Sequence, residues 1–239
     1  MAAIIEELMP NVWAYRVTFW ESCQATLQMF VLSGIFSFVL GLAVGVLLTV
    51  SRPEGIAPNR IIFRVTDVLI NIFRSIPFII LLIFIIPVTR FLAGTAIGVR
   101  GAVVPLVFGT VPFYARQVET ALAGVAPGKI EAARSMGTGP AGLIFKVYLY
   151  EAVPELIRVT TITAISLIGL TTMAGAVGAG GIGSFAINYG QNLHHQDIVN
   201  VCVIVLLVAV CILQTVGNIF ARKTTNRRLF DGNLRKAKQ

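Results

Sequence analysis

Residues Glu131 to Pro154 read EAARSMGTGPAGLIFKVYLYEAVP and form a polar, basic stretch between two long apolar segments. Just upstream, Pro127 suits the first turn of a helix, where its missing N–H would be unpaired anyway. Gly137 stands where a left-handed residue would end that helix, and Pro140 can open a helix but cannot continue one. The stretch is therefore predicted to form two short helices around a break.

The first of these helices should carry little side-chain bulk, because two alanines follow Glu131 directly. Another protein surface could then approach its backbone closely. The alternative interpretation is a solvent-facing loop helix with a local ion pair between Glu131 and Arg134, which would contribute only a few tenths of a kcal/mol.

The stretch resembles the EAA loop of ABC importer permeases: Glu131-Ala132-Ala133, three residues, Gly137, nine residues, then Val147-Tyr148-Leu149. That family usually has a proline where this chain has Tyr150, and here the proline comes later, at Pro154. The resemblance implies an all-α, polytopic permease fold in which the loop, here residues 122–158, docks into a cleft of a cytoplasmic ATPase. The residues assigned to that contact are Glu131, Ala132, Ala133, Arg134, Ser135, Met136 and Gly137.

The composition is that of a membrane protein. Hydrophobic residues make up 56% of the chain and charged residues 13%, with a mean hydropathy of +0.83, whereas soluble domains carry about 25% charged residues. The net charge of +8 then indicates basic cytoplasmic loops rather than a nucleic-acid surface. The three cysteines lie in apolar segments without metal-type spacing, which favours packing roles over disulfides or ligands.

A single permease domain covering residues 1–239 is predicted, with five membrane spans. They are placed at about 23–49, 65–87, 101–121, 159–180 and 198–221. The third is short and is interrupted by Pro105 and Pro112, so a re-entrant segment is the alternative to a full span. A loop is expected near 88–100, and a polar turn is expected from Tyr189 to Asn200.

The distribution of Lys and Arg predicts the orientation of these spans. With five spans, the Lys and Arg residues of the 52–64 loop, of the EAA-like loop and of the tail from Arg222 onward all lie on one side of the membrane. The other side receives only Arg16, Arg90 and Arg100. Because cytoplasmic loops carry the excess of Lys and Arg, the N-terminus is expected outside and the C-terminus in the cytoplasm. The EAA-like loop then lies on the side where ATP is.

Polar and small residues inside the spans are the passage candidates. Asp67 and Arg74 either face an interior cavity or, as the alternative, Arg74 reaches the nearby interface. Residues 174–184 are too rich in small side chains for an unbroken helix, and they either pack tightly or line the passage. Met173 is the candidate gate, because a flexible thioether can seal an irregular gap. The other candidates are Ser166, Thr171, Thr172, Asn71 and Ser75.

No catalytic or nucleotide site is expected on this chain. The Gly178–Gly183 segment fits GxGxxG but lacks a βαβ context, and the Gly124–Lys129 segment lacks the spacing and the Ser or Thr of a P-loop. Ser184 with His194 or His195 lacks a nucleophile elbow and a third orienting group. An intramembrane hydrolase and a passive channel remain as alternatives, and neither gives a reason for the EAA-like loop.

Further segments resemble the methionine-importer branch of these permeases: Arg74–Leu82 (RSIPFIILL), Gly94–Gly98 (GTAIG) and Gly175–Gly183 (GAVGAGGIG). The resemblance implies inward passage of L- and D-methionine by alternating access across the bacterial inner membrane, with histidine or another polar amino acid as the alternative cargo. The implied partners are a second copy of the chain, two cytoplasmic ATPase subunits holding ATP and magnesium, an external substrate-binding lipoprotein and membrane lipid. The chain itself is expected to bind no cofactor, metal or nucleic acid.

Overall fold

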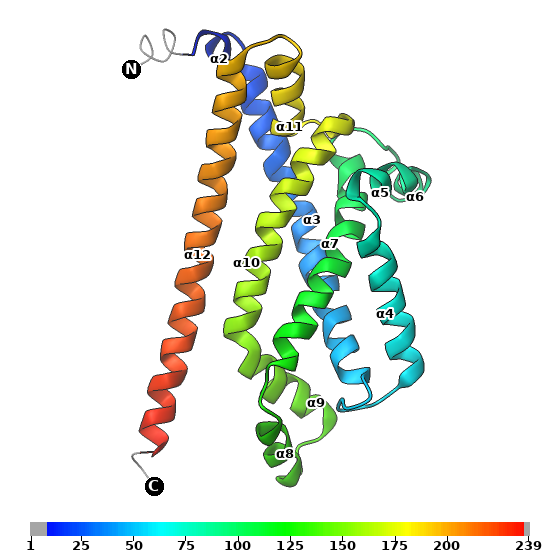
Figure 1. Cartoon of the computed structure of the whole chain (residues 1–239), viewed down its shortest axis with the longest axis vertical. Coiled ribbons are helices and arrows are strands. Elements are labelled where there is room, and N and C mark those ends of the chain that lie inside the picture. Colours follow the sequence, from blue (N-terminus) through cyan, green and yellow to red (C-terminus); the bar gives the residue numbers. More distant parts are fainter. Residues whose placement is uncertain (1–8, 237–239) are drawn as a thin grey trace. The chain divides into compact units, whose positions relative to one another are not determined.

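The computed structural model describes residues 9–236, and all regular structure in this range is helical (Figure 1). The all-α class predicted from the sequence is confirmed. The helices are α2 (Pro10–Ala14), α3 (Arg16–Ser51), α4 (Arg60–Ser75), α5 (Phe78–Phe84), α6 (Ile86–Ala93), α7 (Gly98–Ala123), α8 (Pro127–Ser135), α9 (Pro140–Gly142), α10 (Leu149–Ala174), α11 (Gly181–Phe185) and α12 (Gln196–Lys236). Three wider π-helical segments join some of them: η1 (Leu143–Tyr148), η2 (Gly175–Ala179) and η3 (Ala186–Gln191).

Within the described residues, 4 helices are long and apolar enough to cross a membrane, and a fifth crossing is counted if the bent pair α4 and α5 is one span. The 4 are α3, α7, the continuous run Pro140–Ala179, and α12 as far as Thr225. The predicted segments 23–49 and 101–121 lie inside α3 and α7, and 198–221 lies inside α12.

Three local expectations were wrong. Residues 88–100 do not form a simple loop, since α6 occupies Ile86–Ala93 and ends at Gly94 in the left-handed conformation, with φ 74°. The prolines of 101–121 do not interrupt α7, because a membrane helix can lose single backbone hydrogen bonds where neighbours replace them. The turn expected over 189–200 is reduced to 192–195, between η3 and α12.

The sequence Ser75-Ile76-Pro77 predicts a loosened helix just after Arg74, and the structure has a break there. Pro77 has φ −56° and ψ 134°, an extended conformation that precedes α5. Proline has no N–H to donate to the carbonyl four residues earlier, and it disfavours helical geometry at Ile76 before it. The apolar segment 65–87 is therefore split into α4 and α5 instead of running as one rod.

The described chain forms two compact units, and the long helices contribute a part to each. Unit 1 comprises Met1–Ser37, Ser75–Thr110 and Ala164–Ile212, of which the first eight residues lie outside the described range. Unit 2 comprises Phe38–Arg74, Val111–Thr163 and Leu213–Gln239, of which the last three residues lie outside the described range.

Unit 1 contains the Gly-rich break predicted near 174–184. The backbone leaves helical geometry at Val177 and Gly178, and Gly180 and Gly181 both have φ 80°. Two buried clusters surround this region, one around Met29, Leu106, Leu167 and Ala174, the other around Phe185, Ile182, Ile198 and Cys202. The doubt about an unbroken helix through this segment is therefore confirmed.

Unit 2 has a core centred on Tyr114, whose ring meets Phe38 edge-on at 5.1 Å and whose hydroxyl lies 2.7 Å from that of Thr160. Gly41 and Gly45 of α3 face α7 so closely that a Cβ on Gly45 would stand 2.6 Å from the Cβ of Val118. The Gly-x-x-x-Gly spacing thus allows the backbones of α3 and α7 to approach each other.

Candidate functional site

Helix α8 contains the EAA-like residues and has the predicted ends. Pro127 is at its first position, and the Lys129 N–H donates to the Ala126 carbonyl at 3.1 Å. At its other end, the Gly137 N–H donates to Arg134 O at 2.9 Å and the Thr138 N–H to Ala133 O at 3.1 Å. These two bonds form a Schellman motif, which needs a left-handed residue, and Gly137 has φ 77°. The predicted glycine cap is confirmed.

Almost all of α8 faces outward from unit 2. Ala133 is its one fully buried residue, at 7% exposure, and Ile130 packs against the Tyr114 cluster, so these two side chains hold the helix on unit 2. Glu131, Ala132, Arg134 and Ser135 are exposed, as is Met136 just beyond the helix, at 78%. A short helix with small side chains is thereby presented for contact with another surface.

The local ion pair considered for α8 is absent among the described residues. The Arg134 guanidinium instead donates to the Ile56 carbonyl at 3.4 Å, in the loop between α3 and α4. Glu131 has no ion-pair partner among the side chains of residues 9–225, which are the ones described. Its carboxylate is therefore available to a partner protein.

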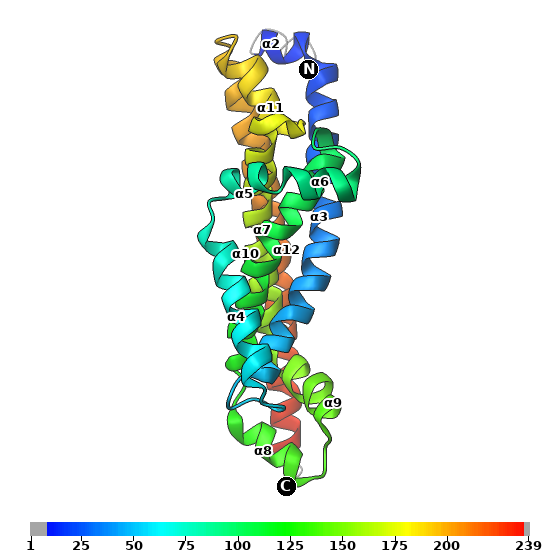
Figure 2. The ribbon, with the colours of Figure 1, turned by 90° about the vertical axis from the view of Figure 1, so that its right-hand side faces the viewer.

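The second short helix expected after Pro140 is not a separate element. Residues 140–174 run as one continuous helix, in which η1 links α9 to α10, and Pro154 lies inside α10. Figure 2 shows α8 and α9 near each other at one end of the helices. Helix α8 contacts η1 directly. The part of the loop downstream of Gly139 is therefore an extension of the membrane helix itself.

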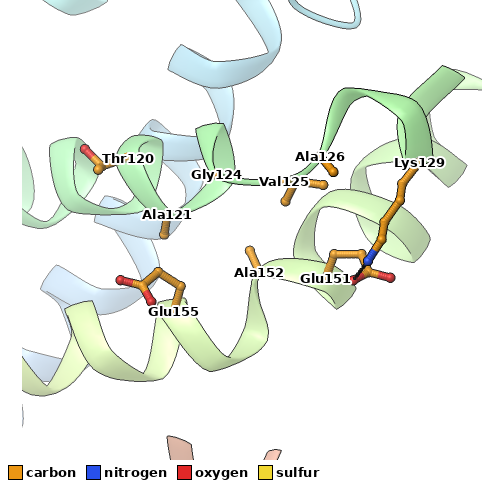
Figure 3. A pocket seen from close by; sticks show the side chains of 9 residues that line it. All are labelled: Thr120, Ala121, Gly124, Val125, Ala126, Lys129, Glu151, Ala152 and Glu155. Carbon is orange, nitrogen blue, oxygen red and sulfur yellow. Dashed lines mark hydrogen bonds and ion pairs between the residues drawn. The ribbon is translucent and has the colours of Figure 1, made fainter. Parts of the chain in front are cut away.

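A pocket of about 470 Å³ lies beside α8 (Figure 3). The residues lining it are Thr120, Ala121, Gly124, Val125, Ala126, Lys129, Glu151, Ala152 and Glu155. Across it, the Lys129 ammonium reaches the Glu151 carboxylate at 2.7 Å and so links α8 to α10. This Lys129 side chain is 56% exposed, so the ion pair is expected to contribute less than about 1 kcal/mol to stability.

The passage candidates on α10 fall into two groups. Ser166 and Met173 are exposed and seven residues apart, which places them on one face of the helix, and Met173 is 47% exposed. Thr171 is buried and donates to the Ile168 carbonyl at 2.7 Å, and Thr172 donates to the same carbonyl at 3.1 Å. The two threonine hydroxyls therefore bond the helix backbone, whereas Ser166 and Met173 face outward.

Asn71 and Ser75, the remaining candidates, are exposed on α4. Asn71 belongs to a network centred on Arg116 of α7, whose guanidinium lies 2.5 Å from Asp67, 2.6 Å from Glu119 and 3.2 Å from the Asn71 side-chain oxygen. The pairing of Arg116 with Glu119 is local, because the two residues are three positions apart on one helix. That Asp67 shares this arginine was not expected, because no local pattern links positions so far apart in the sequence.

Sequence reasoning also missed the polar face of α4. Its residues are spaced by four and three positions in turn: Arg60, Arg64, Asp67, Asn71 and Arg74. This spacing places them along one side of the helix, while Ile61, Val65, Val68 and Ile72 are exposed on the rest of its surface. The period of these polar residues could have revealed the face before the structure was known.

Ser184, considered for a hydrolase, accepts a hydrogen bond from the Asn188 amide at 3.0 Å. Both residues lie in the same turn, on α11 and η3. The bond is a local one between helix neighbours, and the described residues place no histidine in hydrogen-bond contact with Ser184.

Comparison with known proteins gives the family. The sequence profile described as "Binding-protein-dependent transport system inner membrane component" matches residues 38–228. The chain is 42% identical over 202 residues to the probable D-methionine transport system permease protein MetI of Vibrio cholerae, covering 84% of this chain and 90% of that protein. It is 49% identical over 166 residues to MetI of Escherichia coli K12, covering 70% and 75%.

A solved structure entitled "Inward facing conformations of the MetNI methionine ABC transporter" matches with a TM-score of 0.86 and 44% identity, covering 88% of this chain and 98% of that chain. The resemblance inferred from the EAA-like stretch is confirmed, and with it the multi-pass inner membrane location. The chain belongs to the family of binding-protein-dependent transport system inner membrane components, and it is a permease subunit rather than an enzyme.

Proposed function

We propose that this chain passes methionine, in its L and D forms, inward across the membrane by alternating access. The support is the set of relatives named as D-methionine transport permeases, together with the solved methionine ABC transporter of the same fold. The energy comes from a partner ATPase that holds ATP and magnesium. The working assembly contains two copies of the chain, two such ATPase subunits, an external substrate-binding lipoprotein and surrounding lipid.

The orientation follows from the positive charges. Arg52, Arg60 and Arg64 belong to one loop and the following helix start, and Lys129, Arg134 and Lys146 belong to the segment 122–158. With the N-terminus outside and five spans at the positions given above, both groups and the basic tail face the cytoplasm. Helix α8 is then presented to the cytoplasmic ATPase.

Coupling is assigned to Glu131–Gly137, and the observation that carries it is that α8 buries only Ala133 while exposing the residues around it. When ATP closes the ATPase dimer, the cleft that holds α8 moves. Because α8 contacts η1, and η1 continues into α10, the movement reaches a membrane helix without an intervening flexible loop. A bound partner shifts a conformational equilibrium only if it binds the two states with different affinity. The ATPase cleft that holds α8 would supply this difference between the two conformations of the permease.

The passage is assigned to the outward-facing polar and small residues of α4 and α10. Met173 is the proposed gate, with Ser166 on the same face of α10, and the passage candidates of α4 are its exposed residues Asn71 and Ser75. Thr171 and Thr172 hold the backbone of α10 next to the gate through their bonds to the Ile168 carbonyl.

The coupling assignment is tested by adding bulk to α8. Ala132 is exposed, so Ala132→Leu should leave folding unchanged while obstructing a closely fitting cleft. We expect co-purification with the ATPase subunit to weaken and methionine uptake into proteoliposomes to fall about tenfold, equivalent to about 1.4 kcal/mol of contact energy. The control is Ala57→Leu, the same change at an exposed position of the α3–α4 loop. Normal uptake and co-purification in the Ala132 variant would contradict the assignment.

A further inference from the structure

Arg74 is the one arginine on the polar face of α4 that stands next to the helix break. Its side chain is exposed, and among the side chains described, residues 9–225, no carboxylate lies at ion-pair distance from it. The acidic residue on the same face, Asp67, is already paired with Arg116. The positive charge of Arg74 is therefore uncompensated within the described chain.

Its position along α4 puts this charge deep in the membrane. Arg60 and Arg74 are separated by about 21 Å at the rise of an α-helix, and the hydrocarbon core is about 30 Å thick. With the span beginning near residue 65, as proposed above, Arg74 lies about 14 Å inside the hydrocarbon core, close to the middle of the bilayer. The favourable interaction of a cation with a helix C-terminus is several times smaller than the cost of a charge at that depth. Arg74 therefore requires water and an anion.

The helix break after Arg74 indicates which anion could bind there. Helix α4 ends at Ser75, and the chain is extended at Pro77 before α5 begins. The C-terminal end of a helix carries a partial negative charge, which attracts an ammonium group. The guanidinium of arginine matches the two oxygens of a carboxylate. A broken helix at the middle of the membrane that offers both is complementary to a zwitterionic amino acid.

We propose that Arg74 binds the α-carboxylate of the transported amino acid inside the passage, with its α-ammonium at the C-terminal end of α4. This site rests on the proposed function, since it presupposes an amino acid in the passage. The permease itself would then select for zwitterions, in addition to any selection by the binding protein outside the membrane.

The first test uses proteoliposomes that contain the complete importer with its ATPase and binding protein. Arg74→Gln should lower methionine import about tenfold, on the scale of one charge-assisted hydrogen bond, while ATP hydrolysis stays within about twofold of wild type. Arg74→Lys should recover part of the import, because it keeps the charge and loses only the planar fork. Arg60→Gln is the matched control, since it removes the same charge from the far end of the same face and should leave import unchanged.

The second test measures the contribution of the ligand's carboxylate to binding. Methionine and methioninol, which lacks the carboxylate, are compared for binding to the permease–ATPase complex without the binding protein, and binding to the ATPase alone is subtracted. The wild-type complex should prefer methionine about tenfold, the scale of one charge-assisted hydrogen bond, and Arg74→Gln should lose the preference.

The proposal would be overturned if Arg74→Gln imported as much methionine per ATP as wild type, or if this variant kept the preference for methionine over methioninol. It would also be overturned if import and ATP hydrolysis fell together, because Arg74 would then be needed for folding. Failure of the wild-type importer to take up methionine would instead contradict the proposed function. The two failures are therefore distinguishable.

Discussion

The hydroxyl oxygen of Thr26, in α3, accepts a hydrogen bond from the backbone N–H of Ile182, in α11, at 2.8 Å, and both residues are buried in unit 1. Helix α11 begins after Gly180, which has no side chain to cap it. The first N–H groups of a helix lack partners within the helix, and at membrane depth water cannot supply them. Thr26 therefore caps α11 from a different helix.

Replacing Thr26 by valine should reveal this cap, because valine has nearly the same shape but no acceptor. We expect Thr26→Val to lower the free energy of unfolding by about 1–3 kcal/mol, the cost of a buried N–H left unpaired. Thermal denaturation of the purified permease in nanodiscs measures the change. Thr26→Ser keeps the oxygen and should stay close to wild type, so equal losses in both variants would show that packing is what matters at this position.

The close contact between α3 and α7 predicts that Gly45 tolerates alanine poorly, whereas Gly128, in α8 and outside this contact, tolerates it well. In Gly45→Ala the new Cβ would lie 2.7 Å from the Ala115 carbonyl oxygen as well as against Val118, so the helices must separate. We expect a loss of about 1–3 kcal/mol, as for other overpacked sites, again read from thermal denaturation. A Cβ on Gly128 meets nothing within 4 Å, and Gly128→Ala should stay within about 0.5 kcal/mol of wild type.

The arginine-centred network in unit 2 predicts an order of effects. Arg116→Gln leaves the carboxylates of Asp67 and Glu119, 30% and 17% exposed, without their cation. We expect it to cost about 2 kcal/mol or more, since hydrogen bonds to charged groups contribute about 1.5–3 kcal/mol each. Glu119→Gln should cost less, because Arg116 keeps Asp67. Chemical unfolding of the three proteins measures the order, and an equal or reversed order would contradict a shared arginine.

The left-handed turn after α8 predicts different effects of alanine at Gly137 and at Gly139. Gly137 has φ 77°, so Gly137→Ala should cost about 1–2 kcal/mol of backbone strain and displace α8, with a matching fall in methionine uptake. Gly139 has φ −69° and open space around it, so Gly139→Ala should be neutral in both assays. Uptake in proteoliposomes and thermal denaturation together check this. Equal behaviour of the two variants would mean that the turn does not set the position of α8.

Much of the fold and of the proposed coupling site could be predicted from local chemistry. Pro127, Gly137 and Pro77 act through their own backbone restrictions, so their effects could be read from single positions and were confirmed. Membrane helices were predictable in the same way, because about 20 apolar residues in a row have few other uses.

What escaped prediction depends on partners distant in the sequence. Arg134 bonds a carbonyl in the α3–α4 loop instead of its helix neighbour, and Asp67 shares Arg116 across two helices. The continuity from α9 to α10 was missed because Pro140 suggested a separate short helix, whereas η1 carries the helix through. Polar contacts between elements and wide helical turns leave no local trace in one sequence.

The π-helical turn η1 has a consequence for chain length. A π turn holds one residue more than the α-helical ladder needs, so removing a single residue from Leu143–Tyr148 should convert it to a regular α turn and leave the rest of α10 in place. The same deletion a few residues later would rotate every downstream side chain by about 100° around the helix axis. A one-residue deletion is thus tolerated within η1, between the ATPase-facing segment and the membrane helix. It is disruptive in the α-helical turn that follows.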